Sequence, residues 1–215
     1  MEKAVYSAVL TPFKKDLTID TKLFISHCEF LLKNNISLAP LGTTGEANSI
    51  SISEKVDLIK TIANSDLPKE KIIIGTGNTS FIDAAFLTKT AVENKIYSVL
   101  LLPPFYYKNV SDEGVYQYYK KIINTVKSTN LRIFLYNIPQ VSGVIISIEL
   151  QRRHAAEDED AAIHWRQLPN TAAQFIQVAR VSALIHNTHQ EEHGRSRQAV
   201  IKHLQHGAIG GDCCT

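Results

Sequence analysis

The sequence lacks the features that mark several classes of protein. Its three cysteines, Cys28, Cys213 and Cys214, form neither a disulfide framework nor a metal-binding spacing, which favours a reducing cytoplasmic location. No apolar run approaches the ~18 residues of a membrane-spanning helix, and the N-terminus has no signal-peptide pattern. The formal net charge of +2 is too small to indicate nucleic-acid binding. We therefore expect a globular protein without a metal or cofactor.

Arginine is scarce before residue 150, and lysine is scarce after it. Residues 1–150 contain fifteen lysines and one arginine, whereas residues 151–215 contain one lysine and six arginines. Seven of the eight histidines lie in the second segment, and all eight tyrosines lie in the first. Such a break marks a domain boundary or a junction between segments of different genetic origin. We therefore consider 1–150 and 151–215 separately.

Apolar runs alternate with helix-like segments in residues 1–150. The expected strands cover residues 4–10, 36–41, 71–75, 96–102 and 131–136. Capping residues begin the helices between them: Asp20, Ser51, Ser80 and Ser111. Strands that alternate with helices in this way indicate right-handed βαβ units and a parallel sheet, because a parallel connection needs a crossover. The sequence therefore predicts an α/β fold.

Polar and hydroxyl-bearing residues follow each expected strand, at the edge where α/β proteins build their sites. The segment Gly42-Thr43-Thr44-Gly45-Glu46 stands out among them. We expect its glycines to allow a close approach of the backbone or a positive φ, and its threonines to hold a small carboxylate. An ordinary βα turn is the alternative for this segment alone.

The segment Gly75-Thr76-Gly77-Asn78 is an incomplete nucleotide-binding pattern. The third glycine of a dinucleotide fingerprint is missing, since Ser80 occupies its place. A phosphate-binding barrel is therefore a weaker hypothesis, which protection of this loop by phosphate would support.

Five segments, in their order and spacing, resemble the dihydrodipicolinate synthase / N-acetylneuraminate lyase family. They are Thr11-Pro12-Phe13, Gly42 to Glu46, Gly75 to Asn78, Pro103-Pro104-Phe105-Tyr106-Tyr107 and Leu135-Tyr136-Asn137-Ile138-Pro139. The resemblance covers about residues 1–150. It implies a TIM (β/α)8 barrel, usually a homotetramer, that acts on pyruvate or a related 2-keto acid through a Schiff base, as a lyase or aldolase.

The resemblance also implies roles for individual residues. Gly42, Thr43 and Thr44 match the segment that holds the keto-acid carboxylate, and Thr44 also passes protons. Tyr136 matches the tyrosine that acts as general acid and base, for which its ordinary pKa near 10 would need tuning. Tyr106 or Tyr107, of which we favour Tyr106, matches a tyrosine that reaches a neighbouring subunit's site. For each tyrosine the alternative is a half-buried aromatic residue whose hydroxyl is hydrogen-bonded.

Two positions depart from the family's pattern. Val141 stands where the synthase branch has an arginine that binds the second substrate, which favours another 2-keto acid aldolase or lyase of the family. The imine-forming lysine of the sixth strand is not found, because Lys202 is the only lysine after residue 150 and nothing around it would activate an amine. The Schiff-base lysine therefore stays unassigned.

Residues 151–215 are expected to form a mostly helical tail after only five βα units, whereas a closed barrel has eight units and about 250 residues. The tail's His189-Gln190-Glu191-Glu192-His193 resembles a zinc motif only loosely, and a solvated helix is the preferred interpretation. We expect a truncated or altered lyase with a frameshifted or chimeric tail, inactive in the covalent step and of open oligomeric state. The alternative is a non-enzymatic homologue that binds a 2-keto acid or an amino acid.

Overall fold

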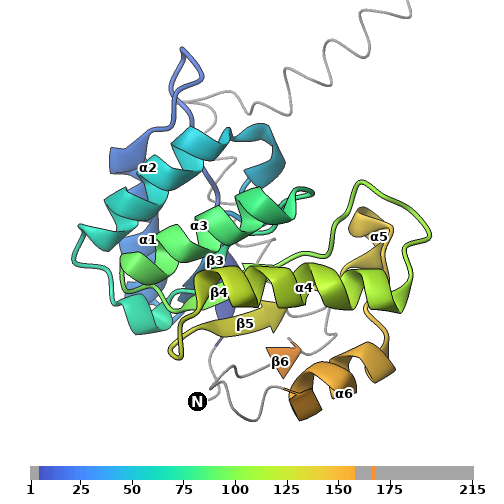
Figure 1. Cartoon of the computed structure of the whole chain (residues 1–215). Coiled ribbons are helices and arrows are strands. Elements are labelled where there is room, and N and C mark those ends of the chain that lie inside the picture. The colour runs from blue at the N-terminus through green and yellow to red at the C-terminus, as the bar shows by residue number, and fades with distance from the viewer. Residues whose placement is uncertain (1–4, 158–165, 168–215) are drawn as a thin grey trace, which may run out of the picture.

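The structure is a computed structural model that describes residues 5–157 and 166–167. Within these residues, six short strands alternate with helices (Figure 1). The strands are β1 (Tyr6–Ala8), β2 (Ser37–Ala39), β3 (Ile74–Gly75), β4 (Ser98–Leu101), β5 (Arg132–Leu135) and β6 (Arg166–Gln167). The α-helices are α1 (Thr21–Lys33), α2 (Ile52–Ala63), α3 (Phe81–Glu93), α4 (Asp112–Val126), α5 (Pro139–Ser142) and α6 (Ile148–Glu157). Two 3-10 turns, η1 (Ala47–Ser49) and η2 (Lys69–Lys71), complete the order.

All strand pairs among the described residues are parallel, as the alternation of strands and helices predicts. β1 pairs with β2, and β3, β4, β5 and β6 follow one another in a second sheet. A parallel bridge between Leu38 and Ile72 joins β2 to the segment that leads into β3. The strands therefore form one arc in chain order, with their carboxyl ends at the same edge.

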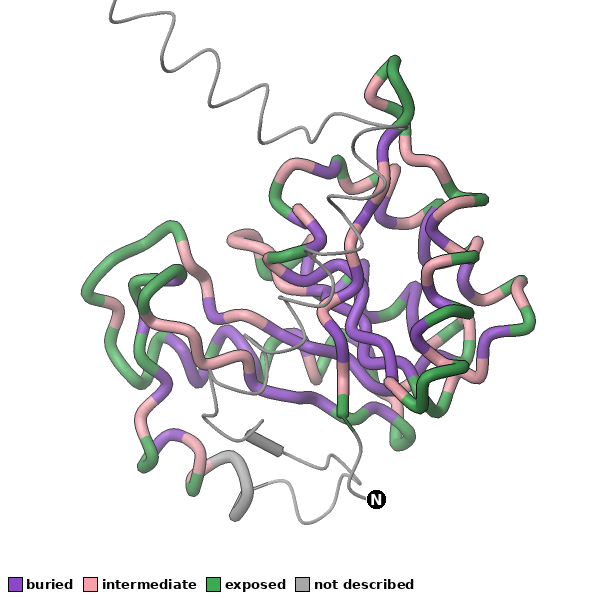
Figure 2. Tube along the Cα trace, turned by 180° about the vertical axis from the view of Figure 1, so that it is seen from behind, coloured by how far each residue is buried: buried purple, intermediate pink, exposed green. Residues whose placement is uncertain are grey.

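The helices α1 to α4 pack along one side of this arc, and the strands lie inside (Figure 1). Every residue of β2, β3 and β4 is buried, and these strands lie within the purple parts of the trace in Figure 2. Ile73, Leu100 and Phe134 form an inner cluster, with Tyr6 and Tyr136 against it. The neighbouring strand residues face the helices in the larger core. Burial on both faces explains why the strands are continuous apolar runs rather than alternating ones.

The four predicted N-caps are confirmed. Asp20 accepts a hydrogen bond from the Leu23 amide, and Ser80 and Ser111 cap α3 and α4 in the same way. Ser51 and Glu54 form the reciprocal capping box at the start of α2. These caps satisfy backbone N–H groups that a helix leaves without a partner, so they fix where each helix begins.

Some expected elements differ in detail. The expected strand over 71–75 begins only at Ile74, because residues 69–71 form the turn η2. In α1, Phe30 is 48% exposed. The buried stripe of that helix runs through Phe24, Cys28 and Leu31, which are spaced by four and three residues, and Phe30 lies beside it.

The chain beyond the expected junction at residue 150 continues the fold for a short distance. The helix α6 spans that position and packs on α4: Leu150 is buried, and Arg153 forms an ion pair with Glu113. The Arg153 guanidinium also lies 3.6 Å from the centre of the Tyr116 ring. β6 then pairs with β5, so the structure adds one strand to the five that were expected. Every other feature proposed for residues 158–215, including the histidine-rich helix and Lys202, lies outside the described residues.

Candidate active site

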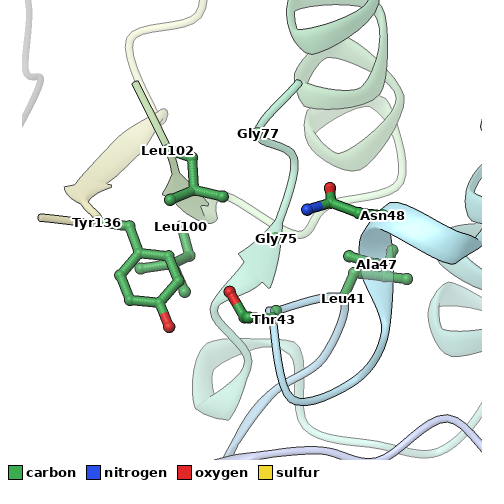
Figure 3. Close-up of a pocket in the computed structure, with 10 residues that line it drawn as sticks. Leu41, Thr43, Ala47, Asn48, Gly75, Gly77, Leu100, Leu102 and Tyr136 are labelled. Carbon is green, nitrogen blue, oxygen red and sulfur yellow. The ribbon is translucent and has the colours of Figure 1, made fainter. Parts of the chain in front are cut away.

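A small cavity opens where the carboxyl ends of β2 to β5 meet (Figure 3). The residues that line it are Leu41, Gly42, Thr43, Ala47, Asn48, Gly75, Gly77, Leu100, Leu102 and Tyr136. Three of them carry polar side chains, namely Thr43, Asn48 and Tyr136, and none of them carries a charge. The cavity therefore has backbone and apolar walls with a few neutral hydrogen-bonding groups, which is typical of a small-molecule site.

The loop after β2 forms one wall. Hydrogen bonds from Glu46 N to Thr43 O (3.1 Å) and from Ala47 N to Gly42 O (3.3 Å) fold it back on itself before η1. The positive φ in this loop belongs to Leu41 and Glu46, both at 56°, and not to its glycines. The expectation of a positive φ at Gly42 or Gly45 is therefore wrong.

The glycines serve close packing between neighbouring loops instead. A Cβ on Gly45 would lie 2.6 Å from Val9 O, and Thr11 Oγ1 donates to Gly45 O at 2.7 Å. A Cβ on Gly75 would lie 1.9 Å from Leu41 O. Because these neighbours are backbone atoms, only glycine allows the strand ends to approach so closely.

The loop after β3 is held by hydroxyl groups of two helices. The hydroxyl of buried Thr76 is 2.9 Å from that of Thr88 on α3. Tyr118 on α4 donates to Asn78 O at 2.5 Å, and burial raises the pKa of Tyr118, so the phenol keeps its proton. These contacts fix the backbone of Gly77, which lines the cavity.

The loop after β4 carries Tyr106 and Tyr107 away from the cavity. Their side chains are 74% and 59% exposed, and the two rings meet edge to face at 5.4 Å. Lys108 closes the loop against α5 by donating to Phe105 O (2.9 Å) and Ser142 O (3.0 Å). This loop therefore presents two tyrosines to the outside of the chain.

The loop after β5 is shaped by Asn137. Its side-chain oxygen accepts from Ile146 N at 3.1 Å, and its amide donates to Ile146 O at 3.3 Å. This pair of bonds draws the segment after α5 back to the end of β5. The Tyr136 ring, one residue earlier, lies at the cavity, partly buried against the inner cluster.

The structure brings together part of the predicted site. Gly42, Thr43 and Tyr136 line the cavity, and the hydroxyl ends of Thr43 and Tyr136 project into it (Figure 3). Thr44 is exposed, and neither it nor Tyr106 is among the lining residues. Sequence reasoning missed Asn48, because its only signal is its place in the turn that follows the glycine–threonine segment.

One buried lysine was not foreseen from the sequence. Lys55 on α2 is 4% exposed, and burial lowers its pKa while the Asp83 carboxylate raises it in part. A desolvated amine of this kind is the type that forms imines. Lys55 does not line the cavity, however, and β6 supplies Arg166 and Gln167 rather than a lysine. The part of the chain that the structure describes therefore offers the cavity no lysine.

The described ranges contain neither a metal-binding cluster nor a membrane-spanning helix. No cluster of three or more His, Cys, Asp or Glu side chains there could bind a metal ion. Among the same residues, no helix has the length and apolar character needed to cross a bilayer.

A parallel α/β arc with a neutral cavity at its strand ends places the chain among the barrel-type α/β proteins that bind small molecules at this edge. Comparison with known proteins is more specific. The model of the dihydrodipicolinate synthetase family matches residues 1–164. A 4-hydroxy-tetrahydrodipicolinate synthase of Archaeoglobus fulgidus is 34% identical over 158 residues, 74% of this chain and 53% of that protein. The 4-hydroxy-tetrahydrodipicolinate synthase of Chloroherpeton thalassium is 36% identical over 172 residues, which are 80% of this chain and 55% of that protein.

Solved structures give the same result. Dihydrodipicolinate synthase from Agrobacterium tumefaciens superposes with a TM-score of 0.72 at 28% identity, covering 83% of this chain and 62% of that one. The 2-keto 3-deoxygluconate aldolase from Picrophilus torridus superposes with a TM-score of 0.69 at 25% identity, covering 84% of this chain and 64% of that one. The chain therefore belongs to the dihydrodipicolinate synthetase family, a family of TIM barrels. It spans about half the length of the curated relatives that it matches.

Proposed function

We propose that this chain is a lyase of the class I aldolase type by descent, and that its cavity binds pyruvate or a related 2-keto acid. The support is the family membership together with the retained cavity of Gly42, Thr43 and Tyr136. In this proposal the backbone and hydroxyl groups around Thr43 and Thr44 hold the carboxylate. Tyr136 donates a hydrogen bond to the ketone oxygen. The proton transfer through Tyr136 and Thr44 that the family resemblance implies belongs to the ancestral activity.

The observation that carries the proposal is the Thr43 hydroxyl. Thr43 Oγ1 is buried and has no hydrogen-bond partner among the described residues. A buried hydroxyl without a partner costs about 1–3 kcal/mol, so such groups are rare unless something else completes them. A ligand oxygen in the cavity would complete this one, and it would regain that free energy on binding.

The covalent step is a separate matter, because a class I aldolase needs a lysine whose amine attacks the ketone carbon. The described residues provide none at the cavity. We therefore propose that the chain binds its 2-keto acid without forming an imine. Cleavage or condensation of a carbon–carbon bond is the ancestral activity in this proposal, and it is lost here together with the lysine.

Reductive trapping tests the covalent step. The purified, folded chain is incubated with pyruvate and borohydride, and its intact mass is measured. We expect no added mass, with an intact family synthase as the positive control. A stable pyruvyl adduct would contradict the proposed loss, and peptide mapping would then decide between Lys55, Lys202 and the other lysines.

Ligand-observed NMR with pyruvate tests the binding step. Thr43→Val should weaken pyruvate binding about 3- to 10-fold, the factor expected for one neutral hydrogen bond. The same change should leave the free energy of unfolding unchanged or raise it, because it removes an unsatisfied buried group. Thr125→Val on the outside of α4 is the matched control, since that hydroxyl only donates to Lys121 O. Equal effects of the two variants on binding would refute the role of Thr43.

A non-enzymatic homologue that binds a 2-keto acid or an amino acid for regulation is the second candidate. It is favoured by the same absence of a lysine at the cavity, and it shares the binding prediction. We also propose, from the change in composition at residue 150, that residues 151–215 are a frameshifted or chimeric replacement. In that case the inactive lyase and the non-enzymatic homologue differ in their evolutionary history and not in their present chemistry. Close relatives that share this tail in an uninterrupted gene would refute the replacement.

A further inference from the structure

The third polar side chain of the cavity has no place in the proposed carboxylate site. Asn48 lies in η1, five residues after Thr43, and is exposed to solvent. It lines the same cavity as Thr43 (Figure 3). Two residues so close in sequence can face one cavity here only because the loop between them folds back on itself.

The fold-back is built into the backbone. Glu46 has a left-handed conformation with φ 56°, and its amide donates to Thr43 O at 3.1 Å. The next turn is closed by bonds from Ser49 N to Glu46 O (2.8 Å) and from Ile50 N to Ala47 O (3.3 Å). The positions of Thr43 and Asn48 relative to each other are thus fixed by consecutive backbone hydrogen bonds.

The Asn48 amide is available to a ligand. It makes no hydrogen bond to any residue in the described ranges, unlike Asn78 and Asn137, whose side chains shape their own loops. Figure 3 shows it directed toward the backbone between Gly75 and Gly77, which forms another wall of the cavity.

The chemistry of an amide limits what it would bind there. It donates through nitrogen and accepts through oxygen, so it suits a hydroxyl or a carbonyl group. The cavity lining carries no charge that would balance a second carboxylate or an ammonium, and an unbalanced charge is costly to bring out of water. Val141, 53% exposed on α5, is uncharged as well.

We propose that Asn48 is a specificity-determining residue: it binds a neutral oxygen-bearing group on the part of the ligand beyond the keto group. The inference rests on the proposed binding of a 2-keto acid at Thr43. It assigns to the site a 2-keto acid with a hydroxylated chain, in preference to an unsubstituted or doubly charged one.

A ligand series tests this assignment on the full chain. Affinities are measured for 2-oxobutyrate, 4-hydroxy-2-oxobutyrate and 2-oxoglutarate, with pyruvate as the reference. We expect the hydroxylated ligand to bind about 3- to 10-fold more tightly than 2-oxobutyrate, as one additional neutral hydrogen bond allows. The dicarboxylate should bind more weakly than 2-oxobutyrate.

The variant Asn48→Ala should abolish the gain from the hydroxyl, measured as the ratio of the affinities for 4-hydroxy-2-oxobutyrate and 2-oxobutyrate in the same variant. Asn124→Ala, at an exposed position of α4, is the matched control and should preserve the gain. Circular dichroism and the thermal midpoint test whether both variants fold. If Asn48→Ala does not fold, it is replaced by Asn48→Ser, which keeps a shorter polar group and should also reduce the gain.

The possible failures are distinguishable. If the folded chain binds no 2-keto acid, the proposed function and this inference both fall. If it binds pyruvate but the hydroxyl gives no gain, or if Asn48→Ala weakens pyruvate and the hydroxylated ligand equally, only the role of Asn48 is refuted.

Discussion

The close approach of Gly75 to the end of β2 gives a prediction that separates two glycines of the site. In Gly75→Ala the new Cβ would lie 1.9 Å from Leu41 O and 2.6 Å from the Leu41 carbonyl carbon. Contacts of a Cβ below 3.0 Å are essentially never seen, so Leu41 or Gly75 must move by about 1.1 Å. In Gly42→Ala, by contrast, the nearest atom is Ala39 O at 3.8 Å, an ordinary contact.

The cost of Gly75→Ala has two parts. Overpacking of a well-packed site costs about 1–3 kcal/mol. Movement of the backbone also strains the bond from Gly75 N to Pro40 O (2.8 Å), whose loss would add about 0.5–1.5 kcal/mol. We therefore expect Gly75→Ala to destabilise the chain by about 2–4 kcal/mol, whereas Gly42→Ala should change stability by less than about 1 kcal/mol.

Thermal and urea unfolding, followed by circular dichroism, measure this difference. For a chain of this size, about 2–4 kcal/mol corresponds to a fall of the thermal midpoint by about 5–15 °C. Leu41 and Gly75 both line the cavity, so Gly75→Ala should also weaken ligand binding in the fraction that stays folded. Equal stability of the two variants would refute the inference that this glycine exists for backbone packing.

Two further predictions concern buried titratable groups. Tyr118→Phe should destabilise the chain by about 1–3 kcal/mol in urea unfolding, because it leaves the Asn78 carbonyl without its buried donor. The control Tyr97→Phe, directly before β4, should have little effect. Burial raises the pKa of the Cys28 thiol to about 12, so iodoacetamide at pH 8 should modify Cys28 only after unfolding; mapping the label to Cys28 in the native chain would contradict this. Because the folded state holds this proton more tightly, the contribution of Cys28 to stability should be complete below pH 9 and decline as the pH rises toward 12.

The sequence predicts the scaffold well, because local signals determine it. Capping side chains at Ser51 and Ser111 fixed the helix starts, and apolar runs indicated strands buried on both faces. These are short-range effects that each segment carries by itself. The parallel order of the strands follows from them, since helical crossovers leave few other arrangements.

The cavity is less predictable, because contacts between loops far apart in sequence shape it. Nothing in the sequence shows that Gly75 lies against Leu41, or that Tyr118 on α4 supports Asn78 forty residues earlier. A glycine's neighbours are set by tertiary packing. The close approach expected of Gly42 and Gly45 is made by Gly45 and also by Gly75, and not by Gly42. Asn48 was missed for the same reason, since only the left-handed turn at Glu46 brings it to the cavity.

The contacts that build the cavity bear on the proposal that the chain binds a 2-keto acid without catalysis. Each contact joins one strand-end loop to the next: Gly45 to Thr11, Gly75 to Leu41, and Gly77 to Leu102. The residues that make these contacts all come from β1 to β5 and the loops that follow them. The imine chemistry instead depends on one amine from a strand beyond them, as the family resemblance implies. We therefore propose that a change confined to the later part of the chain removes the covalent step and leaves Thr43, Asn48 and Tyr136 at the cavity.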